Sequence, residues 1–468
     1  TAGTSDAGLT IDGPINEKTT FIASVRQSYL QFLFKLIKLP FLPTYNDFQF
    51  KVKHELSSTS EISIIGLGAI DNFKLNTTVN NNITDEDILK RNNYILGNIP
   101  IQKQWNYTIG AVYKHFSENS MRQVVLSRNE WENNAKKYFN NTNNASDLLL
   151  KYSSKEVENK LRFENLQTTN NNYKINIGFG LENAEYSNAT FQKIANSNGI
   201  SEIDFTSNLS MLKYSLFGQV SKKYFNSELG VSFGIRVDGT DYNNEMKNGL
   251  NQLSPRLSLS YEINKNITFN ASAGSYFQLP TYTILGYRSE TGELVNKTNE
   301  LKYINAKHLV SGIEFKSAGN SKISLEGFYK VYKNYPFSVR DQISLANLGS
   351  DFGVVGNEEV ISNSEGRSYG FEVFAQKKSY SGLYGLVSYT FVVSEFKDKT
   401  DKFISSSWDN KHLLTVTGGK KLNKNWEIGG KFRLVGGSPF TPYNIDASSN
   451  IENYNVSNQG ILDYNIIN

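Results

Sequence analysis

The chain has 468 residues and a net charge of +4, from 49 Lys and Arg against 45 Asp and Glu. This near balance, without a basic run, excludes the charge pattern of a nucleic-acid-binding protein. The absence of cysteine excludes disulfides, cysteine nucleophiles and cysteine-based metal sites. Aromatic residues make up 13% of the chain, while prolines number only 9 and the hydrophobic share is 38%. This composition differs from that of an ordinary soluble enzyme.

The longest apolar stretch lies early in the chain, at residues 30–43. It is interrupted by Lys35 and Lys38, and it is shorter than the roughly 20 residues that a membrane-spanning helix needs. We therefore exclude a helical membrane protein. The stretch predicts a short apolar or amphipathic helix in the first long loop, at the rim of the fold. The alternative is a loop buried in a core.

Further along the chain, apolar and polar residues alternate with a period of two. The alternation over residues 256–263 stops at a polar turn and resumes over residues 267–273, which is typical of a β-hairpin with one apolar and one polar face. Residues 229–238 and 369–376 show the same pattern. The sequence therefore predicts strands that separate two different environments.

The connections between these strands alternate between short and long. Short turns are predicted near residues 57–60, 117–119, 169–172, 224–226, 264–266, 318–320 and 422–424. Long polar loops are predicted near residues 73–99, 191–210, 241–251, 279–304, 341–365, 399–409 and 437–466. About 18 long strands joined in this way predict an all-β fold, a transmembrane antiparallel β-barrel. The alternative, a soluble propeller, has short strands and blade motifs, which the sequence lacks.

The polar positions of the strands carry more charge than the core of a soluble sandwich could hold. Arg236, Arg256 and Glu372 are examples, and we predict that they face the barrel interior while the apolar positions face lipid. Aromatic residues gather towards the strand ends, as expected for the girdles at a membrane interface.

Several motifs, taken together, resemble the barrel of TonB-dependent outer-membrane receptors. They include SYFQLPT at residues 275–281, EGRSYGFE at 365–372 and WDNKH at 408–412. Further motifs lie at residues 12–15, 26–29, 45–47, 215–219, 229–242, 254–256 and 436–440. Each motif is weak alone, but their order and spacing cover nearly the whole chain.

The resemblance implies a barrel of the 22-stranded type, in which residues 1–468 form an incomplete barrel domain. A plug domain and one strand would precede the chain, and three strands would follow it. The implied location is the outer membrane of a Gram-negative bacterium. The implied partners are the lipid of that membrane, TonB acting through the plug, and a small-molecule or oligosaccharide ligand, without nucleic acid or a cofactor.

The resemblance also implies a function, the TonB-dependent import of a scarce solute such as a siderophore, another metal chelate, a cofactor or an oligosaccharide. A passive porin or a surface adhesin is the alternative. No catalytic or nucleotide-binding motif occurs, so we predict no enzyme activity, no catalytic residue and no metal site. Asp85, Glu86 and Asp87 offer carboxylates to a hard cation, but a solvated acidic loop is the simpler interpretation.

Two groups of residues are candidates for function. Aromatic rings and a guanidinium group in the outer loops suit sugars, planar chelates and aromatic ligands alike. These candidate ligand contacts are Tyr282, Tyr287, Arg288 and Trp408. The candidate plug contacts in the lumen are Arg26, Arg236, Asp238, Arg256 and Glu372. The alternative for each member of the second group is that it fills a wet barrel interior without a specific role.

Overall fold

The computed structural model describes residues 2–3, 5–196, 199–317, 321–348, 355–422, 425–457 and 460–464. In this part of the chain, antiparallel strands form one sheet of 19 strands. All but one of these strands have nine residues or more, which confirms the prediction of an all-β fold with about 18 long strands.

The strands of the large sheet are β1 (Asp6–Asn16), β2 (Thr19–Ser28), β3 (Phe41–Ser57), β4 (Ser60–Leu75), β5 (Ile101–Ser117), β6 (Ser120–Tyr138), β7 (Leu148–Thr168), β8 (Lys174–Asn196), β9 (Gly199–Tyr224), β10 (Leu229–Thr240), β11 (Ser254–Asn264), β12 (Ile267–Gln278), β13 (Ile304–Lys316), β14 (Ser321–Ser338), β15 (Val360–Tyr380), β16 (Leu383–Lys397), β17 (Phe403–Ser405), β18 (Lys411–Lys421) and β19 (Glu427–Val435). A separate pair consists of β20 (Tyr443–Asn444) and β21 (Ile461–Leu462).

The helices are short and lie between strands. They are α1 (Leu30–Leu36), α2 (Glu86–Asn98), α3 (Asn244–Lys247), α4 (Tyr282–Leu285), α5 (Val295–Thr298), α6 (Ile445–Ser448) and α7 (Ile451–Ser457), with 3₁₀ turns η1 (Phe139–Asn141), η2 (Ala145–Asp147), η3 (Gly249–Gln252) and η4 (Leu345–Asn347). None of these helices, in the part of the chain that is described, is long and apolar enough to cross a membrane.

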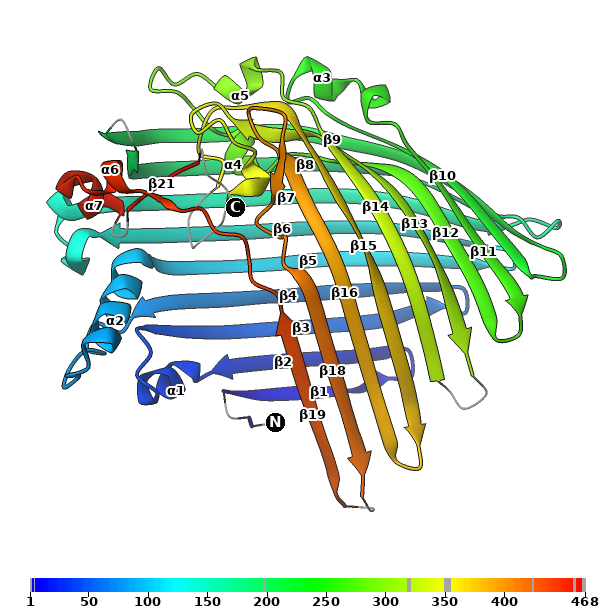
Figure 1. Ribbon diagram of the computed structural model, residues 1–468. Coiled ribbons are helices and arrows are strands. Elements are labelled where there is room, and N and C mark those ends of the chain that lie inside the picture. Colours follow the sequence, from blue (N-terminus) through cyan, green and yellow to red (C-terminus); the bar gives the residue numbers. More distant parts are fainter. Residues whose placement is uncertain are drawn as a thin grey trace.

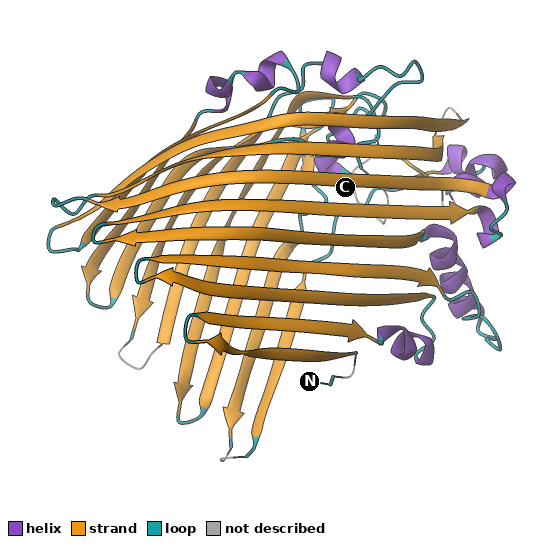
Figure 2. Cartoon of the chain, turned by 180° about the vertical axis from the view of Figure 1, so that it is seen from behind, coloured by secondary structure: helices purple, strands orange, loops and turns teal. Residues whose placement is uncertain are grey.

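Consecutive strands pair in order along the sheet, except that β16 pairs with both β17 and β18. The sheet curves so that β1–β9 form one wall and β10–β19 form the facing wall (Figure 1). The strands β1 and β19 are its two edges, and no register joins them within the described residues. The hairpin turns gather at one end of the walls and the helices at the other (Figure 2).

Most of the predicted connections are confirmed. The short turns near residues 57–60, 117–119, 169–172, 224–226 and 264–266 are present, whereas residues 318–320 and 423–424 lie outside the described residues. The loop predicted at residues 191–210 is wrong, because β8 continues to Asn196 and β9 begins at Gly199. In this part of β8 and β9 most of the outward positions are polar, as Glu185 and Ser210 are, and such a composition resembles that of a loop.

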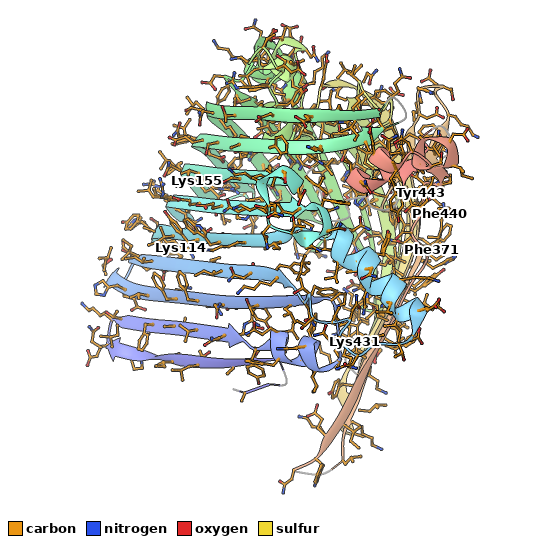
Figure 3. The ribbon with its side chains drawn as sticks, turned by 90° about the vertical axis from the view of Figure 1, so that its left-hand side faces the viewer. Lys114, Lys155, Phe371, Lys431, Phe440 and Tyr443 are labelled. Atoms are coloured by element: carbon orange, nitrogen blue, oxygen red, sulfur yellow. The ribbon has the colours of Figure 1, made fainter. Side chains whose placement is uncertain are left out.

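The two faces of the sheet differ as the alternation predicts. Val231 pairs with Leu259 on one face, and Ser232 pairs with Ser258 on the other. Large apolar side chains on the first face are exposed, and Leu216, for example, is 65% exposed. Phe371 lies on the outer side of the β15 wall (Figure 3). The apolar face is therefore the convex outer face, and the polar face lines the lumen.

The predicted apolar loop helix is confirmed as α1. It contains no buried residue, so the alternative of a buried loop core is wrong. Phe34 packs edge-on against Phe41 of β3, with 5.5 Å between the ring centroids. Asp85 of the acidic run caps α2, because its Oδ1 accepts from the backbone N–H groups of Asp87 and Ile88.

The fold predicts opposite membrane exposure for its two ends. Lys265, in the turn between β11 and β12, and Glu290, in the loop between β12 and β13, are both exposed and lie at opposite ends of the sheet. In intact cells, a cysteine in place of Lys265 should resist a membrane-impermeant maleimide, and a cysteine in place of Glu290 should react. Equal labelling of both, or the reverse pattern, would contradict this orientation.

Candidate functional site

The outer loops fold into the opening of the curved sheet and form a small core there. Met246, Leu285 and Leu301 of this core are fully buried, and they pack with Tyr186 and Met211 on the inner face of β8 and β9. We call this assembly the mouth lobe (Figure 1). It consists of residues 241–253, 279–303, 339–348 and 355–359. The lobe narrows the opening from the side of β7–β10.

Tyr282 of α4 attaches the mouth lobe to the wall. Its hydroxyl donates to Glu158 Oε1 of β7 at 2.7 Å, and its ring stacks on that of Tyr186 at 5.9 Å. The Lys213 ammonium lies 4.9 Å from the centre of the Tyr282 ring and is ion-paired with Glu158 and Glu182. Burial raises the pKa of the Tyr282 hydroxyl, which keeps it a donor to the carboxylate.

Asn296 of α5 joins two loops of the mouth lobe through a fully buried amide. Its Nδ2 donates to the carbonyl oxygens of Ile284 at 2.7 Å and Glu358 at 3.0 Å. Its Oδ1 accepts from the backbone N–H of Val360 at 2.9 Å. One side chain therefore provides a partner for the Glu358 carbonyl and the Val360 N–H, and a second partner for the Ile284 carbonyl, which also accepts from the backbone N–H of Tyr287 at 3.3 Å.

A polar cavity of about 410 Å³ lies between the mouth lobe and the segment that follows β19. Arg340 lines it, and its Nε and Nη2 donate to the two carboxylate oxygens of Asp341 at 3.0 and 2.7 Å. Glu358 lies 3.5 Å from the same guanidinium; burial raises the pKa of Glu358, and Arg340 opposes this. The cavity thus presents charges of both signs and many hydrogen-bonding groups.

The segment that follows β19 crosses the opening towards β8 and β9. Figure 3 labels Phe440 and Tyr443 in this segment. At its far end, Asn453 Nδ2 donates to the carbonyl oxygen of Asn196 at 3.4 Å. The mouth is therefore covered from two sides, by the mouth lobe and by this segment.

The structure places three of the four predicted ligand contacts together in the mouth lobe. Tyr282 is only 8% exposed. Tyr287 packs edge-on against Phe205 at 5.5 Å, and Arg288 donates to the carbonyl oxygen of Gly292 at 2.7 Å. Trp408, by contrast, is 54% exposed and lies between β17 and β18. Ligand contact by these four residues stays a prediction, and for Tyr282 the structure shows a role in holding the lobe.

The sequence did not indicate the residues that hold the mouth lobe. Glu158 and Lys213 lie in strands where the alternation of apolar and polar residues predicts that both side chains face inward. This alternation could have identified them as candidates. Asn296 is one of many asparagines in polar loops, and nothing in its neighbourhood distinguishes it. Its partners lie 12 to 64 residues away.

The predicted lumen residues all lie on the inner face, but the structure does not bring them into one site. Arg26 of β2 is ion-paired with Asp47 of β3 at 2.8 Å. Arg236 and Asp238 pair with each other along β10, on the opposite part of the sheet. Contact with a plug by these residues stays a prediction.

Arg256 and Glu372 also face the lumen, in different surroundings. Arg256 Cζ lies 4.5 Å from the centre of the Tyr276 ring. Glu372 stands directly opposite Glu326 in the register of β14 and β15, and the described residues provide neither glutamate with a salt bridge. The lumen wall therefore carries unpaired charges of both signs.

A curved antiparallel sheet with an apolar outer face, short turns at one end and folded loops at the other defines a membrane β-barrel. Residues 44–467 match the family described as TonB dependent receptor-like, beta-barrel. The chain belongs to this family, whose members are receptors and transporters rather than enzymes. Membership implies a location in the outer membrane of a Gram-negative bacterium.

Solved structures of siderophore receptors share the fold. The pyoverdine receptor FpvA from Pseudomonas aeruginosa, bound to pyoverdine, is 13% identical with a TM-score of 0.68, over 94% of this chain and 66% of that chain. The alcaligin receptor FauA from Bordetella pertussis is 14% identical with a TM-score of 0.57, over 92% and 65%. The ferric-catecholate import receptor Fiu from E. coli K12 is 9% identical with a TM-score of 0.65, over 92% and 70%.

The chain thus spans less than two thirds of the length of FpvA and FauA. No curated protein matches it. At these identities the likeness to solved structures shows the fold alone, and the family rests on the match over residues 44–467.

Proposed function

We propose that the full-length protein imports a scarce solute across the outer membrane with energy supplied through TonB. The solute binds at the mouth, between the mouth lobe and the segment that follows β19. The observation that carries this proposal is the preformed mouth lobe, because buried polar contacts at Tyr282 and Asn296 hold it in place. A mouth ordered before the ligand arrives lowers the entropic cost of binding.

The ligand class follows from the lining of the mouth. A cavity of about 410 Å³ with Arg340 and Asp341 suits a polar solute that both donates and accepts hydrogen bonds. Tyr287 of the mouth lobe and the exposed Trp408, between β17 and β18, are further aromatic rings of the outer loops. The solved structures of similar fold are siderophore receptors, so ferric siderophores are the first class to test.

The test uses the full-length protein in a Gram-negative host that lacks its own siderophore receptors. Growth under iron limitation is measured with a panel of ferric siderophores, in cells with and without TonB. We expect at least one siderophore to support growth, and this growth to vanish without TonB. TonB-independent entry of unrelated small solutes would favour the porin, and surface attachment without any uptake would favour the adhesin.

A further inference from the structure

The outer face of β5–β8 changes in character from row to row of paired residues. One row is entirely apolar, and it consists of Ala111, Leu126, Leu161 and Leu181. This row belongs to the apolar outer face of the sheet. Five further rows follow it towards the loop end of these strands, from the row of Ile109 to the row of Ile101. They show where the outer wall leaves the hydrocarbon.

Two aromatic residues mark the edge of the apolar band on β5. Trp105 and Tyr107 face outward in successive rows, since they alternate with the inward residues of the strand. Their rings stack, with 6.0 Å between the centroids and 9° between the planes. Trp and Tyr rings gather at the level of the lipid headgroups in membrane proteins. Outward residues beyond Trp105 therefore lie at the headgroups or just outside them.

The charges next to the apolar band neutralise one another. Glu130 Oε1 lies 2.5 Å from Lys155 Nζ, and Glu130 Oε2 lies 2.9 Å from Arg128 Nη2. The hydroxyl of Tyr107 donates to the same carboxylate at 3.1 Å. Glu130 is only 6% exposed. This carboxylate is therefore fully engaged by donors of the protein itself.

Two further acids face outward on these strands. Glu132 stands opposite Lys155 in the register, and its Oε1 accepts from Asn134 Nδ2 at 3.0 Å. Glu185 stands in the same row as Glu130. The five rows beyond the apolar row thus carry five outward cations and three outward acids. The surface keeps an excess of positive charge.

This excess lies in the two rows farthest from the apolar band, which hold three lysines and no acid. The rows consist of Lys103, Asn134, Ser153 and Ala189, and of Ile101, Lys136, Lys151 and Phe191. We call Lys103, Lys136 and Lys151 the outer lysine cluster. All three are exposed, and no salt bridge in the described part of the chain involves any of them.

The register holds the outer lysine cluster together. Lys136 and Lys151 stand directly opposite each other on β6 and β7, an arrangement of like charges that destabilises a sheet. Lys103 lies on the diagonal from Lys136, within reach of a long side chain. An anion over Asn134 and Ser153 would meet all three ammonium groups. It would also remove the repulsion between the two opposed lysines.

The exposure of the outer lysine cluster does not depend on the content of the lumen. The cluster is on the outward face, and β5–β8 pair with a neighbouring strand on both sides. A domain inside the barrel, or further strands at the edges β1 and β19, would leave this face uncovered. The surroundings of the cluster are therefore the membrane surface and the water outside it.

We propose that the outer lysine cluster binds the phosphate groups of a lipid headgroup in the outer leaflet. The long loops of bacterial barrels face the outside, so the loop end of β5–β8 meets that leaflet. Lys103 is two residues from Trp105, about 7 Å along the strand, and its flexible stem can reach back towards the headgroups. Ammonium groups bind phosphate as point charges, and basic clusters at a membrane surface attract anionic headgroups.

Continuity of the surface favours a lipid over a soluble anion. The outer lysine cluster and the apolar row of Leu126 and Leu161 lie on the same face of the same strands. A lipid can place its acyl chains on the apolar band and its phosphates at the lysines, whereas a soluble anion uses only the lysines. Binding of lipid at this face does not depend on the proposed import function.

The test measures binding of lipid A to the purified full-length protein in a neutral detergent, by native mass spectrometry. The two probes are diphosphoryl lipid A and the same lipid after removal of its phosphates. We expect the phosphorylated form to bind more tightly. Lys136→Gln and Lys151→Gln should each raise its Kd about fivefold, the contribution of one lysine near a charged membrane surface.

Two variants serve as controls. Lys222 also faces outward, because it pairs with Val231, but it lies at the turn end, and Lys222→Gln should change the Kd by less than about twofold. Lys151→Arg keeps the charge and should retain binding of the phosphorylated lipid. Lys136→Gln relieves a pair of like charges, so it should not lower the thermal stability of the lipid-free protein. Weaker binding by this variant is then a property of the folded protein.

Three outcomes would overturn the proposal. The first is an equal Kd for the phosphorylated and the dephosphorylated lipid. The second is an equal loss of binding in Lys151→Gln and Lys222→Gln, which would mean that any outward lysine beside the apolar band serves equally. The third is displacement of the lipid by an equal concentration of inorganic pyrophosphate, which would identify a site for soluble phosphate.

A photo-crosslinking experiment identifies the occupant of this face in cells. p-Benzoylphenylalanine in place of Ser153 puts the crosslinker between the three lysines, in the full-length protein of a Gram-negative host. We expect illumination of intact cells to give an adduct that stains for glycolipid, and Lys136→Gln together with Lys151→Gln to reduce its yield. An adduct with a second protein chain in place of the glycolipid would overturn the lipid and identify a protein-docking surface.

Discussion

Replacing Leu259 by arginine should destabilise the folded protein in a bilayer by about 2–4 kcal/mol more than replacing its neighbour Ser258 by arginine. Both residues lie on β11, one position apart, and therefore project to opposite faces of the sheet. Leu259 belongs to the apolar outer face and Ser258 to the lumen face. An arginine on the outer face must leave water for hydrocarbon, whereas an arginine in the lumen stays hydrated.

The free energy of unfolding of the full-length protein in liposomes, measured by denaturant titration, checks this expectation. The paired strand offers a matched control, because Val231 stands opposite Leu259 and Ser232 stands opposite Ser258. Val231→Arg should lower the free energy of unfolding by about as much as Leu259→Arg does. Ser232→Arg should lower it by about as little as Ser258→Arg does. Equal costs on the two faces would mean that the outer face does not meet lipid.

The strands and the short turns between them could be predicted from the sequence, because both are determined by residues that are neighbours in the chain. Alternation over residues 256–263 and 267–273 predicts two strands and the turn between them, and the structure has β11 and β12 there. A strand between lipid and water must alternate residue by residue, and the turn sets the register of the hairpin. Neither property depends on distant residues.

The upper parts of β8 and β9 were missed for a physical reason. Beyond the apolar band, both faces of these strands meet polar surroundings or the mouth lobe, so the alternation of apolar and polar residues disappears. Glu185 and Ser210, a directly paired couple on the outer face, illustrate this. Composition alone cannot separate such a strand from a loop.

The mouth lobe could not be predicted because its contacts join distant segments. Tyr282 meets Glu158 across 124 positions of the sequence, and Asn296 reaches Val360 across 64. Loop residues were expected to contact a ligand, since aromatic and guanidinium groups are common in binding sites. In the structure, Tyr282 and Arg288 form hydrogen bonds within the protein. Aromatic and guanidinium groups in loops can therefore hold the loops in place as well as bind a ligand.

Replacing Asn296 by alanine should loosen the mouth lobe without unfolding the barrel. The substitution removes the partners of the Glu358 carbonyl and the Val360 N–H, and each buried group left unsatisfied costs about 1–3 kcal/mol. A loss of about 3 kcal/mol corresponds to more than a hundredfold increase in the population of the opened lobe. Amide hydrogen exchange over residues 279–303 of the full-length protein should accelerate by about that factor, while exchange in β11 and β12 stays slow.

Thr298→Ala provides the matched control on the same short helix. Thr298 is exposed, and its hydroxyl donates to Glu293 Oε1 at 2.9 Å at the surface, so its removal should change local stability by less than about 0.5 kcal/mol. Unchanged exchange over residues 279–303 in Asn296→Ala would show that the buried amide does not hold the lobe. Faster exchange in β11 and β12 as well would show that the lobe and the barrel unfold together. The mouth lobe and the barrel would then form one cooperative unit, and the lobe could not open while the barrel stays folded.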